Sequence, residues 1–161
     1  YGSNVLTLVG RVFYLPPGEN AVLRIFTGGM AFPNGVALSP NEARLYVAEF
    51  SQNRILAFNT NPATPGGNPF IFARFEAGTG PDGLAVDANG NVSAAHFNAG
   101  EVMVVDPRGF TIGAIRLPPE GGLSVTNVGF HDGYLYITEA AKNDVWRVKT
   151  KIAGLPLFHQ R

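Results

Sequence analysis

The chain lacks cysteine and is poor in charge. None of its 161 residues is Cys, so disulfide bonds, a thiolate nucleophile and a cysteine-based zinc site are excluded. Only 15% of the residues are charged, and the 12 basic side chains balance the 12 acidic ones. A chain without a basic surplus has little electrostatic attraction for a phosphate backbone. We therefore expect no nucleic-acid partner.

Long apolar runs are also missing. No stretch reaches the roughly 18 apolar residues that suggest a membrane-spanning helix, so we expect no membrane partner. No charged and apolar leader stands at Tyr1, which favours the cytoplasm if Tyr1 lies near the natural start. Hydrophobic residues nevertheless make up 45% of the chain. That content disfavours disorder and suffices for the core of one domain.

Short apolar or alternating segments recur along the chain, with turn residues between them. Many are rich in Val, Ile, Phe or Tyr, which suit a half-buried strand. Turns such as Asn89-Gly90 and Asp132-Gly133 accept the positive φ that tight hairpins require. No segment keeps a helical apolar period over more than two turns. The sequence predicts an all-β fold.

A repeat is the strongest pattern in the sequence. PNGVAL at 33–38 is matched by PDGLAV at 81–86 and, more weakly, by VTNVGF at 125–130, with starts 48 and then 44 residues apart. A period in the forties with about four strands is typical of β-propeller blades. We expect a single partial propeller over 1–161, with a blade remnant at 1–30 and blades at about 31–78, 79–122 and 123–161.

A complete blade is expected to be a four-stranded antiparallel sheet, and three strands are predicted for the last blade. The predicted strands are 34–39, 44–49, 54–58 and 70–76; then 82–87, 91–96, 101–105 and 111–117; then 126–131, 134–139 and 144–149, with two earlier strands near 11–15 and 21–26. These make about three and a half blades, whereas closed propellers have about four to eight. The chain is therefore either part of a longer protein or a protomer that completes its ring with a second copy, as a homodimer.

The repeat places polar side chains at one mouth of the expected channel, where inner strands begin and the next strands end. The residues expected there are Asn34, Asp82, Asn127, Glu49, His96 and Glu139. Hairpin geometry predicts Asn34 beside Glu49, Asp82 opposite Phe97, Gly83 opposite His96, and Asn127 opposite Thr138.

Such a ring of side-chain oxygens suits a hard cation, since calcium takes about six to eight oxygen ligands. Asn34 and Asp82 are the strongest candidates, although Asn-Gly and Asp-Gly are also ordinary turn formers. Glu49 and Glu139 fit rim residues that are solvated or bonded to backbone. His96 fits a hydrogen-bonded structural residue better than an acid or base.

Two longer stretches resemble one known family. FPNGVALSPNEARLYVAEFSQNRILAF (32–58) and GPDGLAVDANGNVSAAHFNAGEVMVVDPRG (80–109) look like the senescence-marker-protein/gluconolactonase (regucalcin-like) family. The end of the chain, with TNVGFHDGYLYITEAAKNDVWRVKT (126–150) and GLPLF (154–158), is similar to that family's last blade. The resemblance covers about residues 20–158, the C-terminal half of a family member.

The resemblance implies a six-bladed propeller with one divalent cation at the channel mouth, calcium first and zinc as the other choice. Its ligands would include Asn34, Asp82 and a Glu from a blade upstream of this sequence. The implied activity is hydrolysis of a sugar lactone or similar cyclic ester, with Asp82 as ligand and base. Two alternatives stay open: a non-catalytic propeller that binds a ligand or partner, and a metal-free relative resembling strictosidine synthase.

Overall fold

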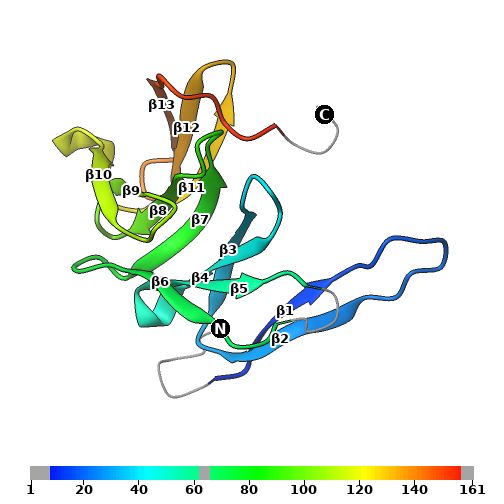
Figure 1. The fold of residues 1–161 in the computed structure, drawn as a ribbon. Helices are drawn as coiled ribbons and strands as arrows, with labels where there is room; N and C mark the ends of the chain where they lie inside the picture. The colour runs from blue at the N-terminus through cyan, green and yellow to red at the C-terminus, as the bar shows by residue number, and fades with distance from the viewer. Residues whose placement is uncertain (1–7, 62–65, 157–161) are drawn as a thin grey trace.

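The computed structural model describes residues 8–61 and 66–156. Within them, thirteen strands form four antiparallel sheets, and two short 3-10 segments lie between strands (Figure 1). Strands that are consecutive in the chain are neighbours within each sheet. The predicted all-β fold is confirmed. Residues 1–7 of the expected blade remnant and the last two residues of GLPLF lie outside the described part.

The strand bounds follow the repeat. The first sheet contains β1 (Gly10–Tyr14) and β2 (Arg24–Met30); the second β3 (Pro33–Leu38), β4 (Arg44–Glu49), β5 (Arg54–Asn59) and β6 (Phe70–Arg74); the third β7 (Gly80–Val86), β8 (Val92–Phe97), β9 (Glu101–Val105) and β10 (Thr111–Arg116); the fourth β11 (Val125–His131), β12 (Tyr134–Glu139) and β13 (Asp144–Lys149). The 3-10 segments are Phe50–Gln52 and Pro119–Gly121. The largest departure from expectation is β2, which starts three residues later and ends four residues later than predicted.

The second and third strands of each blade are joined with the same spacing, because the paired residues next to the turn are five positions apart in all three: Glu49 and Arg54, His96 and Glu101, Glu139 and Asp144. The residue just before the third strand has a positive φ in each blade: 47° at Asn53, 66° at Gly100 and 60° at Asn143. Asn and Gly tolerate this left-handed conformation better than other residues. The constant spacing in the sequence therefore reflects one repeated turn.

The core lies between neighbouring sheets. One cluster joins the second sheet to the third, with Ile55 and Phe72 on one side and Leu84 and Val92 on the other. Further clusters join the third sheet to the fourth and the first to the second. Each sheet therefore buries a face on its neighbour, as propeller blades must.

The inner strands β3, β7 and β11 lie side by side, and β10 and β13 lie at the periphery (Figure 1). After β13 the chain returns to the far end of β7, where Ala88 N donates to Ala153 O at 2.8 Å and Leu155 N to Val86 O at 2.9 Å. Within the described ranges, no helix has the length and apolar character needed to cross a membrane.

Candidate functional site

The three inner strands share a β-bulge at the position of the repeated motif. Pro33 pairs with Glu49, Pro81 with His96 and Val125 with Glu139, and after each pair the inner strand carries one extra residue. Bulges bend a strand and change the direction of its side chains, and they are common next to binding sites. The bulges therefore give the starts of β3, β7 and β11 one shared local geometry.

The observed pairing of the inner strands with their neighbours differs in part from the predicted register. Asn127 does pair with Thr138, as expected. In the third sheet, however, Gly80 rather than Asp82 lies opposite Phe97, and Pro81 rather than Gly83 lies opposite His96. The prediction assumed a two-residue turn at Asn89-Gly90. The real connection is wider, because the Asp87 carboxylate accepts hydrogen bonds from the backbone N–H groups of Asn89 and Asn91, both at 2.9 Å.

The glycines of the two best copies lie where adjacent bulges meet. A Cβ atom on Gly35 would overlap the backbone of Asp82 and come within 2.8 Å of Leu84 N. A Cβ on Gly83 would likewise overlap the side chain of Asn127. Gly at the third motif position thus lets β3, β7 and β11 approach closely. It also places the Asn34 and Asp82 motifs on touching segments of backbone.

Asp82 is the most unusual ionisable group at this end of the strands. Its side chain is half-buried, and within residues 8–61 and 66–156 no hydrogen bond or ion pair holds its carboxylate. Burial raises the pKa of Asp82 from 3.8 to about 6, because the charged form loses solvent without gaining a cation. Asn34, one bulge away, is exposed, and its amide also lacks a partner in the described ranges. A bound cation would supply the charge that Asp82 lacks.

In the fourth sheet the residue equivalent to Asn34 and Asp82 is Thr126, not Asn127. Thr126 is the residue after Val125, just as Asp82 follows Pro81. Its hydroxyl lies 2.9 Å from the Thr138 hydroxyl. Asn127 occupies the glycine position instead, and its amide oxygen accepts from the Val128 N–H at 2.8 Å. Aligning the three motifs from their first residue would have identified Thr126 from the sequence.

The carboxylates of Glu49 and Glu139 form hydrogen bonds within their own blades. Both are buried, and each holds the segment that leads into the inner strand of its own blade. Glu49 accepts from Ala31 N at 2.8 Å and from Arg54 Nε at 2.6 Å. Glu139 accepts from Ser124 N at 2.7 Å and from Lys142 N at 2.6 Å.

The backbone donors also affect the acidity of Glu139. Burial raises the pKa of Glu139, but hydrogen bonds from the N–H groups of Lys142, Ser124 and Ala141 outweigh that effect and leave it below its usual value. This carboxylate is therefore held in its charged form by the backbone around it.

His96 takes the equivalent position in the third blade and is also buried. Its Nε2 lies 3.1 Å from Asn53 Oδ1 of the neighbouring blade, and Asn53 Nδ2 donates to Ala77 O at 2.8 Å. Burial lowers the pKa of His96, and Glu101, 3.7 Å from Nδ1, partly opposes this shift. His96 and Asn53 thus join two blades. Asn53 was not predicted as a site residue, because its only signal in the sequence is its place before a third strand.

Metal binding at this end of the strands can rest on only a few groups. Within the described ranges, no three His, Asp or Glu side chains gather where they could share a metal ion. Asn34 and Asp82 remain as an amide oxygen and a carboxylate on adjacent bulges. Oxygen donors of this kind suit a hard cation, with the remaining positions filled by water or by groups from elsewhere.

Comparison with known proteins identifies a matching protein family. The profile described as the SMP-30/Gluconolactonase/LRE-like region matches residues 2–141. Lactonase drp35 of Staphylococcus aureus (strain USA300) is 34% identical over 124 residues, which cover 73% of this chain and 36% of that protein. The chain thus spans about a third of the length of this curated relative.

Solved structures agree with the fold. A gluconolactonase from Xanthomonas campestris matches with a TM-score of 0.72 and 27% identity, over 89% of this chain and 44% of that one. The calcium-binding protein regucalcin from Agrobacterium tumefaciens matches with a TM-score of 0.75 and 20% identity, over 94% of this chain and 55% of that one. The second likeness supports the fold alone. With the family profile covering most of its residues, this chain belongs to the SMP-30/gluconolactonase/LRE-like family of β-propeller proteins.

Proposed function

We propose that this chain carries part of a divalent-cation-dependent lactonase site, with a sugar lactone or similar cyclic ester as substrate. The observation that carries the proposal is the half-buried Asp82 carboxylate, which has no hydrogen-bond or ionic partner within residues 8–61 and 66–156. It stands on a bulge against the Asn34 motif in a chain whose relatives include proteins named lactonase and gluconolactonase. A desolvated carboxylate of this kind is favourable for cation binding.

Asn34 and Asp82 would hold the cation through an amide oxygen and a carboxylate, and calcium matches these donors better than zinc does. The cation, when bound, supplies Lewis-acid polarisation of the substrate carbonyl. Asp82 would also accept a proton from the attacking water. Burial raises its pKa to about 6 in the absence of a cation, and a bound cation would lower it, so Asp82 would be ionised at neutral pH and able to take that proton.

Hydrolysis and cation binding should be measured separately. We expect base consumption in a pH-stat with glucono-δ-lactone to stop with chelator and return with calcium. Calorimetry should show calcium binding in the parent and its loss in Asp82→Asn. Asp144→Asn, which removes an exposed carboxylate at the start of β13, is the matched control and should change neither result. Chelator-resistant hydrolysis would contradict the cation dependence and favour the metal-free relative.

The rest of the ring must come from additional polypeptide. A largely apolar hollow of about 750 Å³ separates the β1–β2 hairpin from β3, with Phe13, Phe26 and Leu38 among its lining residues. We propose that further blades cover this side of β3, either from a longer chain or from a second copy that forms a homodimer. Sedimentation of the 17.2 kDa chain distinguishes the two: a dimer supports the shared ring, and a stable monomer rules it out.

A binding propeller without hydrolytic activity remains the second candidate. The observation in its favour is that Asn34 and Asp82 supply only two side-chain ligands in the described residues. Calcium binding that depends on Asp82, combined with no hydrolysis of any lactone by an assembled ring, would favour it over the lactonase.

A further inference from the structure

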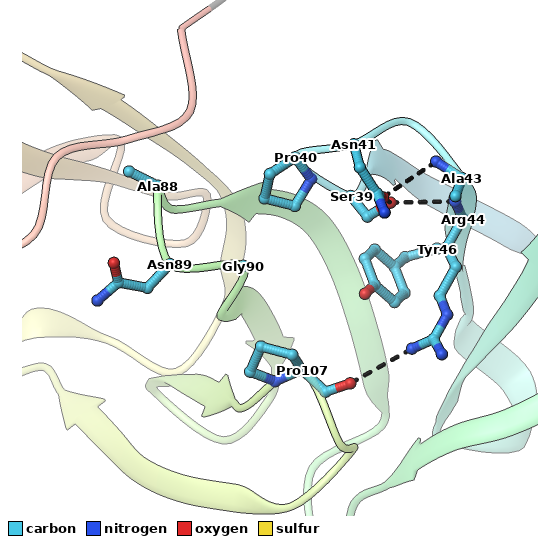
Figure 2. A pocket seen from close by; sticks show the side chains of 10 residues that line it. All are labelled: Ser39, Pro40, Asn41, Ala43, Arg44, Tyr46, Ala88, Asn89, Gly90 and Pro107. Atoms are coloured by element: carbon cyan, nitrogen blue, oxygen red, sulfur yellow. Dashed lines mark hydrogen bonds between the residues drawn. The ribbon is translucent and has the colours of Figure 1, made fainter.

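A second pocket lies at the far ends of the inner strands, away from Asn34 and Asp82. It is formed by the β3–β4 turn, the β7–β8 turn and the turn after β9 (Figure 2). Its volume is about 510 Å³, within the range of about 300–1,000 Å³ typical of small-molecule sites. All its lining residues belong to the second and third sheets. The pocket is therefore complete in this chain, unlike the channel mouth.

The Tyr46 hydroxyl is an unused polar group in this pocket. Tyr46 is only 2% exposed, and its ring packs on Phe72 with centroids 4.6 Å apart. The hydroxyl points into the pocket (Figure 2), and no hydrogen bond joins it to any residue that the structure describes. The hydroxyl oxygen is not fully enclosed, so solvent reaches it through the pocket. A ligand with an acceptor atom would replace that solvent as its hydrogen-bond partner.

Arg44 adds a positive charge beside this hydroxyl. Its guanidinium lies 5.6 Å from the centre of the Phe70 ring, and Nη1 donates to Pro107 O at a long 3.4 Å (Figure 2). No carboxylate pairs with Arg44 in the described parts of the chain. A guanidinium has five N–H donors, so most of those on Arg44 remain available to a ligand.

The acidic groups of the two neighbouring turns are already engaged there, and Glu42 of the β3–β4 turn does not line the pocket. Asp87 accepts hydrogen bonds from the backbone N–H groups of Asn89 and Asn91, and Asp106 forms an ion pair with Arg108 at 2.7 Å. Neither carboxylate lines the pocket. The charged side chain that faces a ligand there is therefore Arg44.

The repeat shows that the blade itself does not require Arg44 and Tyr46. Counting back from the paired positions Glu49 and His96, these residues correspond to Asn91 and Ser93 in the third sheet. That sheet forms the same four strands with the smaller side chains. A cation and a phenol two residues apart on this strand thus occur in only one of these two blades.

We propose that the pocket binds a small organic carboxylate. Arg44 would bind the carboxylate through two N–H groups, the geometry in which arginine and carboxylates pair most strongly. The Tyr46 hydroxyl would donate a further hydrogen bond to it. The apolar body of the ligand would lie against Pro40 and Pro107, which form opposite walls of the pocket (Figure 2). This site is separate from the proposed lactonase site and does not depend on it.

Benzoate is a suitable probe, with benzamide as its uncharged counterpart. In calorimetry at low salt we expect benzoate to bind with a Kd of about 1 mM or tighter, and benzamide to bind at least about tenfold more weakly. Arg44→Gln should weaken benzoate binding about tenfold or more, as the loss of a charged hydrogen bond predicts. Amide chemical shifts of Arg44 and Gly90 should move with benzoate in the parent.

Two further variants make the result specific. Arg147 is also exposed and lies over an aromatic ring, 4.8 Å from the centre of Tyr134, so Arg147→Gln is the matched control and should leave Kd unchanged. Tyr46→Phe should weaken binding severalfold without lowering the melting temperature of the free protein, since its hydroxyl has no hydrogen-bond partner among residues 8–61 and 66–156. Absent benzoate binding, or equal losses in Arg44→Gln and Arg147→Gln, would overturn the proposal.

Discussion

Gly35 lies directly against the backbone of Asp82, so that a Cβ atom at this position would overlap the Asp82 carbonyl oxygen. The two residues belong to successive copies of the repeated motif and are held together by bulges of the same kind. The contact explains why the motif carries glycine after its polar residue. It also means that the backbone around Asp82 depends on the blade before it.

Gly35→Ala should destabilise the protein by about 2 kcal/mol, because overpacking at a backbone contact cannot be relieved by a side-chain rotation. Urea unfolding monitored by tryptophan fluorescence measures the change. Gly113→Ala in β10 is the control: its Cβ would meet no atom within 4 Å, and alanine at an open strand position should be neutral or stabilising by up to about 1 kcal/mol. Equal effects in the two variants would contradict the contact.

Asp82 should make the metal-free protein less stable as the pH rises from about 4 to about 6. The folded state keeps the Asp82 proton up to about pH 6, whereas the ordinary pKa is 3.8. The folded state therefore binds more protons in this window, and stability falls as they are released.

Asp82→Asn should remove this contribution and melt at a higher temperature than the parent at pH 7 in chelator. Thermal unfolding from pH 4 to pH 7 measures the effect, with Asp144→Asn as control. Calcium should stabilise the parent most above pH 6, where Asp82 is ionised. A parent and an Asp82→Asn variant with the same pH dependence would show that Asp82 is not desolvated.

Arg54→Gln should cost about 3 kcal/mol of unfolding free energy, since it leaves the buried Glu49 carboxylate without its cation. Arg116→Gln removes the arginine from the pair with Glu101, whose N···O distance is 3.0 Å. Arg116 is 78% exposed, so the same substitution there should cost less than about 1 kcal/mol. Denaturant unfolding of both variants tests the difference. Similar losses would mean that Glu49 is not buried in solution.

His96 should titrate below 6.5 when its imidazole ring is followed by NMR, because burial lowers its pKa. Since the unfolded chain takes up the proton first as the pH falls below 6.5, His96 contributes stability that is lost on acidification. Glu101→Gln should shift the His96 midpoint further down, because Glu101 favours the charged ring. Glu120→Gln, an exposed change outside the strands, should not move it.

The sequence by itself determined the strands, the turns and the repeat. Alternation of apolar residues and turn residues such as Asn53, Gly100 and Asn143 are local properties, so they could be read without knowing any long-range contact. The paired motifs at Asn34 and Asp82 were likewise visible, because a repeat places equivalent residues at the same point of successive blades.

Only the tertiary structure decided which polar residues face solvent and which are buried. Glu49, Glu139 and His96 carry no local signal for burial, because each also depends on a partner distant in the chain: Ala31, Ser124 and Asn53 respectively. The bulge that shifts the register at Asp82 depends on contact between inner strands. The joining of Arg44, Tyr46 and Pro107 in one pocket likewise depends on how two blades pack, since residues so far apart in the chain meet only when the sheets associate.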